Sequence, residues 1–379
     1  MIAERLRVTI LSVALDDEVR MSFSSLRARR ACLVEVEAGG LVGVGESWIN
    51  YPTWAHRERV ETLCEGLAPH ILGHDVCDPA AVQRRLTEAM LPIGRQWGAP
   101  GPVWQAISGV DLALWDLRGK AQGRSVAALL APSTATRVPA YASGIGPDRV
   151  DHWCKVALSH ELGAAKVKLG FGPEQDRATL QTARSVLGPG TRLFADANQA
   201  WTIDEACAMA PELVAHDVEW LEEPLAGNAI DDLEELAGRS GIPLATGENV
   251  YGLSALLRYA DSRAIATIQP DLAKSGGITV AAALAARAGA NGAALAPHCY
   301  GSAVGIAASL QLAAAFPVVH VIELDLRDNP LRTELLATPL RLEAGELVIP
   351  SGPGLGVELD PDIVDRYRIC EEERCHDDV

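Results

Sequence analysis

The stretch AKVKLG, residues 165–170, is the first of a series of short motifs whose charged residues recur about every 23 to 28 residues. Each motif follows a short apolar run, and the interval fits one β-strand followed by one α-helix. The later motifs are FADANQAW (194–201), WLEEPL (220–225), TGEN (246–249), QPDLAKSGG (269–277), APHCYG (296–301) and VIELD (321–325), with VPAYASG (138–144) before the series. This period predicts a (β/α) barrel that gathers charged side chains at the carboxyl ends of its strands.

The overall composition predicts a globular protein with a large core and an acidic surface. The chain has 379 residues, 48% of them hydrophobic, which suggests two domains. Its 33 basic and 50 acidic residues give a net charge of −17, which repels nucleic acid and anionic membranes, so neither is expected as a partner. An anionic substrate therefore needs a site with local positive charge.

Two further features predict the compartment. No apolar segment approaches the roughly 20 residues of a membrane span, and the N-terminus lacks the features of a signal peptide, so we expect a cytoplasmic protein. The eight cysteines form no C-x-x-C pair and lie mostly in apolar segments, as expected for reduced core residues. We interpret CEEERC at 370–375 as a solvated tail, with chelation or cross-linking as the alternative.

The chain divides into three parts. Residues 1–130 combine alternating strands, hinged at the Gly39-Gly40 turn, with helical stretches, which predicts an α+β cap domain. Residues 131–335 alternate strand-like runs with Ala- and Leu-rich helices, which predicts a barrel of parallel βα units, and we expect the site at its mouth to make this the catalytic domain. Residues 336–379 return to short strands such as LRLEAGELVIP (340–350), which we expect to pack on the cap. In the cap, a core-facing helical stripe is expected from Val103, Ile107, Val110, Leu114 and Leu117.

Two lysines, Lys166 and Lys168, are two residues apart, which places both on one face of a strand. Inside a barrel the two ammonium groups would be desolvated close together, and each would lower the pKa of the other. Lys168 is therefore a candidate general base. The alternative is a solvated surface pair, against which the apolar neighbours Val167 and Leu169 argue.

Three carboxylates, Asp196, Glu222 and Glu248, end successive predicted strands about 26 residues apart. One such acid alone would be an ordinary strand-end carboxylate, but three hard oxygen ligands in sequence favour one Mg²⁺ per subunit. Such an ion would bind a substrate carboxylate and stabilise an enediolate. Asn198 shares the face of Asp196 and is a candidate for supporting the ligand or the substrate. Glu223 alternates to the opposite face, where we expect a salt bridge.

An acid and a histidine, Asp271 and His298, follow neighbouring predicted strands. A carboxylate bonded to an imidazole fixes its tautomer and raises its basicity, which is the arrangement of a general acid–base pair. The other eight histidines have no comparable partner. Glu323 is a candidate hydrogen-bond partner for the enediolate. Asp325 shares its face, but Glu323 lies nearer the expected strand end.

The motifs KVKLG, DANQAW, EEP, GEN, QPDLAKSGG and PHCYG resemble those of the enolase superfamily, and within it the mandelate racemase subgroup, over nearly the whole chain. The resemblance implies a modified TIM barrel of the (β/α)7β type, capped by both ends of the chain. It also implies a role for each matching residue: Lys168 as a base, Lys166 in contact with the substrate carboxylate, Mg²⁺ on Asp196, Glu222 and Glu248, Asp271–His298 as the acid or base on the opposite face, and Glu323 as a hydrogen-bond partner. Muconate-lactonizing relatives carry a base lysine where this chain has Asp271, and Lys274 belongs to the shared KxGG background.

Bases on both faces of an α-carbon allow several reactions. Relatives with this residue set most often dehydrate sugar acids, so the resemblance implies dehydration of an aldonate or aldarate first. Cycloisomerisation of a sugar-acid lactone is the second expectation, and racemisation or epimerisation of a 2-hydroxy acid is another. A non-catalytic binding protein on the same barrel is the alternative from a different class. Loss of a ligand or base would indicate it, and none is missing.

Substrate specificity is expected from the cap, whose loops would close over the barrel. The loops DDEVRMSFSS (16–25) and SWINYPTW (47–54) offer Arg20 to hold a distal carboxylate and Trp48 and Tyr51 as pocket walls. Arg95 to Trp97 are further candidates, and ordinary surface loops are the alternative for each residue. The resemblance also implies a homo-oligomer, from dimer to octamer, that acts on a small-molecule carboxylate.

Overall fold

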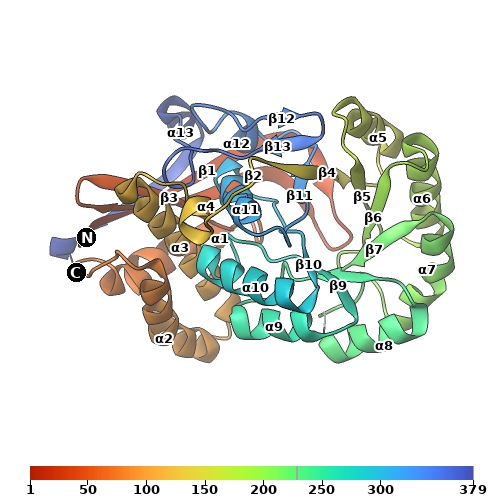
Figure 1. The fold of residues 1–379 in the computed structure, drawn as a ribbon, viewed down its shortest axis with the longest axis horizontal. Helices are drawn as coiled ribbons and strands as arrows, with labels where there is room; N and C mark the ends of the chain where they lie inside the picture. Colours follow the sequence, from red (N-terminus) through yellow and green to blue (C-terminus); the bar gives the residue numbers. More distant parts are fainter. Residues whose placement is uncertain (228, 379) are drawn as a thin grey trace.

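The computed structural model describes residues 1–227 and 229–378, and within them eight parallel strands form a barrel with seven helices outside it (Figure 1). Strands β4 to β10 pair in sequence order, and β11 pairs with β4. A bridge between Leu295 and Val319 links β10 to the segment before β11. The strands are β4 (Arg137–Ile145), β5 (Ala164–Lys168), β6 (Arg192–Asp196), β7 (Val218–Glu222), β8 (Leu244–Thr246), β9 (Ile265–Ile268), β10 (Ala294–Leu295) and β11 (Ile322–Asp325).

One helix follows each of the first seven barrel strands, which is the (β/α)7β order that the resemblance implies. The helices are α5 (Val150–Ser159), α6 (Pro173–Leu187), α7 (Ile203–Ala215), α8 (Ile230–Ser240), α9 (Leu253–Asp261), α10 (Gly277–Asn291) and α11 (Ala303–Ala315). Residues at the helix ends explain where these helices start and stop. Thr202 and Glu205 form a capping box at the start of α7, and Gly241 ends α8 in the left-handed conformation.

The barrel interior is filled by an aromatic layer below the charged residues. The rings of Phe194 and Trp220 are stacked with centroids 3.5 Å apart, and Tyr141 packs edge-on against both. Because strand side chains alternate, Asp196 and Glu222 share the face of these rings and lie one step closer to the carboxyl ends of the strands. The aromatic layer therefore forms the floor on which the charged layer rests.

The cap is an antiparallel sheet covered by helices. Strands β1 (Ala3–Arg20), β2 (Ser25–Ala38) and β3 (Leu41–Ser47) form a meander with its turn at Gly39-Gly40, as predicted. The predicted stripe on α3 (Pro100–Gln122), from Val103 to Leu117, is buried in the cap core. The cap helices are α1 (Ala55–Glu61) with a π turn (Thr62–Leu67) and a 3₁₀ turn (Ala68–His70), α2 (Pro79–Trp97), α3 (Pro100–Gln122) and α4 (Val126–Leu130).

The C-terminal segment divides between the two parts. It comprises α12 (Pro330–Thr333), β12 (Leu342–Glu343), β13 (Glu346–Val348), α13 (Pro361–Tyr367), β14 (Arg368–Cys375) and a 3₁₀ turn (His376–Asp378). Strand β13 pairs with the barrel strand β4, so LRLEAGELVIP joins the barrel instead of the cap. CEEERC lies in β14, which pairs with β1, so it is an edge strand of the cap sheet and not a free tail, although Glu371, Glu372 and Glu373 are exposed as expected. The domain boundaries expected near residues 130 and 335, between the cap, the barrel and the C-terminal segment, stay predictions.

Two further observations concern the cysteines and the hydropathy of the helices. Cys32, Cys64, Cys154 and Cys299 are buried, as expected for core thiols. None of the helices in residues 1–227 and 229–378 combines the length and the hydropathy needed to cross a bilayer.

Candidate active site

The predicted site residues converge at the mouth of the barrel, where the carboxyl ends of the strands lie. Lys168, Asp196 and Glu222 are successive Cα partners at the ends of β5, β6 and β7. The other predicted members follow in order around the barrel: Glu248 after β8, Asp271 after β9, His298 after β10 and Glu323 within β11. The strand-end spacing seen in the sequence thus becomes a ring of side chains.

A cavity of about 670 Å³ lies at this mouth and is lined from both the barrel and the cap. Six of the predicted residues line it: Lys168, Asn198, Glu248, His298, Trp48 and Tyr51. Lining residues that sequence reasoning did not single out for binding include Met21, Phe23, Gln105, Gln199, Tyr251 and Tyr300. Tyr300 follows His298 by two residues, and this alternation was a signal that could have identified it. Five predicted residues lie beneath the cavity, each at most 4% exposed: Lys166, Asp196, Glu222, Asp271 and Glu323.

The two lysines are bonded to different carboxylates. Lys168 donates to Asp196, with Nζ 2.5 Å from Oδ2. Lys166 lies between two acids, with Nζ 2.7 Å from Oε1 of Glu222 and 3.0 Å from Oε1 of Glu323. Lys166 is only 1% exposed and lies below the cavity. Both ammonium groups are thus paired with buried charge.

These pairings change the expected titration of Lys168. Burial lowers the pKa of its ammonium and so does the charge of Lys166, but the carboxylates of Asp196, Glu222 and Glu248 outweigh both and raise it. The expectation of a lowered pKa is therefore wrong for the side-chain arrangement present. The neighbouring lysine is visible within AKVKLG, whereas the carboxylates that dominate the pKa come from the adjacent strands.

His298 is held on both sides of its ring. Nδ1 lies 2.7 Å from Oδ2 of Asp271, as the acid–base interpretation predicted, and Nε2 lies 3.1 Å from Oε2 of Glu248. Asp271 is fixed in turn by the backbone N–H of Ala273, which donates to Oδ1 at 2.8 Å. Burial lowers the pKa of His298, but the charges of Glu248 and Glu323 and the hydrogen bond to Asp271 outweigh it and raise the pKa to about 9.

The two acids of β11 have different surroundings. Glu323 accepts from Oγ of Ser143 at 2.5 Å and from the backbone N–H of Cys299 at 3.0 Å. Asp325 instead forms buried ion pairs with Arg29 of the cap, at 2.5 Å, and with Arg332, at 3.1 Å. Asp325 therefore ties the cap to the barrel, whereas Glu323 faces the charged layer.

The donors present suit a hard divalent cation. Asp196, Glu222 and Glu248 supply carboxylate oxygens from adjacent strand ends, and Oδ1 of the adjacent Asn198 is buried without a hydrogen-bond partner. In the part of the chain that the structure describes, no three acidic, cysteine or histidine side chains converge as a ligand set. Each acid is instead balanced by a protein cation: Asp196 by Lys168, Glu222 by Lys166 and Glu248 by His298. The chemistry of these donors and their place at adjacent strand ends thus fit a hard divalent cation.

Two residues have surroundings that the sequence interpretation missed. Glu223 has φ of 37°, which ends the strand alternation and turns its side chain to the cavity. It accepts from Gln199 at 2.7 Å and Asn249 at 3.0 Å, so the expected salt bridge is wrong for the residues described. Lys274 also lines the cavity, with Nζ 2.8 Å from Oδ1 of Asn249 and 4.5 Å from the ring centroid of Trp48.

Two of the proposed cap contacts lie elsewhere. The side chain of Arg20 is 56% exposed and faces Asp148 at 3.9 Å instead of lining the cavity. Residues 95–97 end α2, and the side chain of Trp97 is exposed and outside the cavity lining. The loop containing Trp48 and Tyr51 reaches the site because Trp48 N–H donates to the carbonyl of Ala273 at 3.1 Å.

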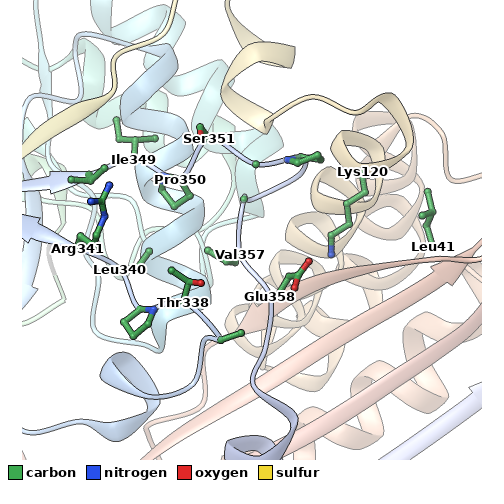
Figure 2. A pocket seen from close by; sticks show the side chains of 16 residues that line it. Leu41, Lys120, Thr338, Leu340, Arg341, Ile349, Pro350, Ser351, Val357 and Glu358 are labelled. Atoms are coloured by element: carbon green, nitrogen blue, oxygen red, sulfur yellow. The ribbon is translucent and has the colours of Figure 1, made fainter.

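A second cavity, of about 660 Å³, lies between the C-terminal segment and the cap (Figure 2). Lys120 lines it from α3, and Arg341 and Glu358 line it from the C-terminal segment. The ammonium of Lys120 is bonded to Asp116 at 2.7 Å and to the carbonyl of Val42 at 2.9 Å. None of the predicted site residues lines this cavity, so it is separate from the candidate active site.

Comparisons with known proteins match both parts of the chain. The model of the mandelate racemase/muconate lactonizing enzyme N-terminal domain matches residues 5–131, and the enolase C-terminal domain-like model matches residues 149–363. The D-galactarolactone cycloisomerase of Agrobacterium fabrum is 31% identical over 96% of this chain and 98% of that protein. The L-talarate/galactarate dehydratase of Salmonella typhimurium is 30% identical over 84% of this chain and 78% of that protein.

Solved structures agree with this assignment. A mandelate racemase/muconate lactonizing enzyme from Bordetella bronchiseptica is 34% identical, with a TM-score of 0.88 over 97% of this chain and 99% of that one. The relatives named above are isomerases and lyases. The chain is therefore an enzyme that belongs to the mandelate racemase/muconate lactonizing enzyme family of the enolase superfamily.

Proposed function

We propose that the enzyme removes the proton α to the carboxylate of a sugar acid and eliminates the β-hydroxyl as water. The observation that carries this proposal is that Lys168 and His298 line one cavity, from strands β5 and β10 that are not neighbours. Two proton-transfer groups that reach one cavity from separate strands can act on different atoms of one substrate.

In the proposed reaction, Lys168 is the base and His298 is the acid. Lys168 takes the α-proton at Nζ, and the electron pair of the broken C–H bond becomes an enediolate. A divalent cation, for which we propose Mg²⁺, would be held by Asp196, Glu222 and Glu248 and supplies Lewis-acid stabilisation of that charge. His298 gives a proton to the β-oxygen, the C–O bond breaks and water leaves. The resulting enol becomes a 2-keto-3-deoxy acid.

The layer beneath the cavity supports this assignment. Lys166 and Glu323 are 3.0 Å apart and almost fully buried, which preorganises charge at the position expected for the substrate carboxylate. The carboxylate of Asp196 is the largest attraction that raises the pKa of Lys168. If Asp196 held a cation, that attraction would be weaker and the pKa of Lys168 lower, as a base requires.

A lactone cycloisomerase is the second candidate. The same proton abstraction would then expel a ring oxygen instead of water. Two observations favour it: the similarity to a D-galactarolactone cycloisomerase over 96% of the chain, and the aromatic side chains of Phe23, Trp48, Tyr51 and Tyr300 around the cavity, which suit the face of a ring. Racemisation or epimerisation of a 2-hydroxy acid uses the same groups and remains a further alternative.

Proton NMR with a panel of substrates tests the proposal. The protein with Mg²⁺ is incubated with aldonates, aldarates, their lactones and 2-hydroxy acids, and Lys168→Ala serves as the control. Formation of a 2-keto-3-deoxy acid from an open-chain acid supports dehydration, and consumption of lactones alone supports cycloisomerisation. Inversion of a 2-hydroxy acid without elimination would contradict both, and so would no reaction with any member.

The assembly and location stay predictions. We propose a homo-oligomer, between dimer and octamer, in the cytoplasm, with a small carboxylate as its partner. Light scattering of the active enzyme at micromolar concentration tests the assembly, and an active monomer would contradict it.

A further inference from the structure

The loop that carries His298 is bonded to the cap by a buried carboxylate. Glu46, at the end of β3, is 1% exposed. Its Oε1 accepts from the backbone N–H of Ser302 at 2.8 Å, and its Oε2 accepts from Oγ of Ser302 at 2.7 Å and from the backbone N–H of Gly305 at 2.8 Å. These donors lie at the start of α11, directly after the loop that carries His298.

The backbone around this contact is adapted to the carboxylate. A Cβ atom on Gly301 would lie 2.5 Å from Oε1 of Glu46, so a larger residue there would force the Glu46 carboxylate to move from its present position. The cap makes a second contact with the same loop, because Nδ2 of Asn50 donates to the carbonyl of Tyr300 at 3.2 Å. Residues 300–305 are therefore held from the cap at several points.

The loop that carries Asp271 has an equivalent attachment. Asp111, on α3, is 1% exposed and accepts from the backbone N–H of Thr279 at 2.9 Å and from its hydroxyl at 2.5 Å. A Cβ atom on Gly277 would lie 2.2 Å from Oδ2 of Asp111. The cap also holds Gly276, whose N–H donates to Oγ of Ser108 at 2.8 Å.

The base on the other side of the cavity has a different support. Lys168 and Asp196 lie within β5 and β6, and the barrel's own strand ladder pairs them with each other. His298 and Asp271 instead follow the ends of short strands, where the chain has left the ladder. The cap also contacts this side, through Oγ of Ser22 bonded to the carbonyl of Asn198 at 3.1 Å, but Lys168 and Asp196 themselves are held by the strand ladder.

We propose that Glu46 and Asp111 are positioning residues that set the geometry of the Asp271–His298 pair from the cap. The cap would then determine the proton-donating half of the reaction, in addition to covering the cavity. This inference rests on the proposed function for its kinetic consequence, whereas its structural consequence is independent of any substrate.

The variant Glu46→Gln tests the inference because it keeps the shape of the side chain and replaces one acceptor oxygen with an NH₂ group that faces N–H donors. In heavy water, we expect α-proton exchange by Lys168 to stay within about threefold of wild type, while elimination falls by about tenfold or more. The fall should appear in kcat and not in KM. Asp111→Asn is expected to show the same split.

The matched control is Asp116→Asn. Asp116 is also a buried carboxylate on α3, but it accepts from Val44 at 2.9 Å and Leu355 at 2.7 Å, outside the two loops. Asp116→Asn should leave the ratio of exchange to elimination unchanged, even if this substitution lowers the melting temperature. If Glu46→Gln does not fold, Ser302→Ala removes one of the same hydrogen bonds from the barrel side and should show a smaller split.

A spectroscopic readout separates this inference from the proposed function. The proton on Nδ1 of His298, bonded to Asp271, should give a downfield imidazole resonance that His298→Asn removes. We expect Glu46→Gln to shift or broaden this signal and Asp116→Asn to leave it in place. An unchanged signal, or an equal fall of exchange and elimination in a folded Glu46→Gln variant, would overturn the inference. Failure of the wild-type enzyme to act on any sugar acid would instead overturn the proposed function.

Discussion

Nδ1 of His298 lies 2.7 Å from Oδ2 of Asp271, and this bond fixes which ring nitrogen faces the rest of the site. The opposite nitrogen, Nε2, faces Glu248 at the edge of the cavity. A protonated ring in this position can deliver its proton only toward the cavity, because the other N–H is bound to Asp271. The pair therefore has the orientation that a general acid needs.

Replacing the orienting carboxylate should weaken catalysis without removing the imidazole. We expect Asp271→Asn to lower kcat by about tenfold to a hundredfold, since the ring loses its fixed orientation. Steady-state kinetics with the substrate found in the panel measures this. Asp148→Asn, at an exposed partner of Arg20, is the control and should be unchanged. Equal activity of Asp271→Asn and wild type would count against a paired acid.

Removal of divalent ions should abolish turnover, and Mg²⁺ should restore it. Glu248→Gln should weaken Mg²⁺ binding by about tenfold or more, because a charged ligand becomes neutral. Calorimetric titration of metal-free protein measures this affinity without substrate. Full turnover in excess chelator would refute the metal assignment.

Substitutions in the cap should affect KM only where the side chain lines the cavity. Trp48 lines the cavity, so Trp48→Ala should raise KM by roughly tenfold, which is about 1.4 kcal/mol of binding. Arg20 faces Asp148 outside the cavity lining, so Arg20→Ala should leave kcat and KM within about twofold of wild type. A large rise in KM for Arg20→Ala together with an unchanged KM for Trp48→Ala would contradict this assignment. It would mean that the cap closes around the substrate in another way.

The stability of the protein should carry a pH dependence from Asp111. Burial raises its pKa from 3.8 to about 7, against hydrogen bonds from Thr279 that lower it. Because the folded state binds this proton more tightly than the unfolded chain, the contribution of Asp111 to stability is present below pH 4. It is lost as pH rises toward 7, by up to about 1.4 kcal/mol per pH unit.

Urea unfolding of wild type and Asp111→Asn between pH 4 and 8 tests this. The free energy of unfolding of wild type, minus that of the variant, should fall as pH rises to about 7 and then stay constant. A difference that is independent of pH would contradict the raised pKa of Asp111.

The parts of the site that were predictable are those determined by strand alternation and spacing. Lys166 and Lys168 share a face as predicted, and His298 meets Asp271, because parallel strand ends of a barrel converge. Glu223 was misassigned because β7 ends one residue earlier, and a positive φ reverses the alternation. The position of Arg20 depends on how a cap loop folds over the barrel, which local spacing does not encode.

The electrostatics were less predictable than the positions. The pKa of Lys168 depends on Asp196, Glu222 and Glu248, which come from three other strand ends. The roles of Glu46 and Asp111 were also beyond local patterns, since each bonds to backbone groups more than 160 residues away. Such contacts follow from the packing of cap on barrel and from glycines at the points of approach.

The division of labour between Lys168 and His298 is the central claim, and proton NMR in heavy water tests it most directly. With the substrate identified by the panel, Lys168→Ala should abolish both α-proton exchange and elimination, whereas His298→Asn should retain exchange and lose elimination. For a substrate of the opposite α-configuration, the loss of exchange should instead follow His298→Asn, because a base takes only a proton that points toward it. Wild-type turnover in both Lys168→Ala and His298→Asn would contradict the account.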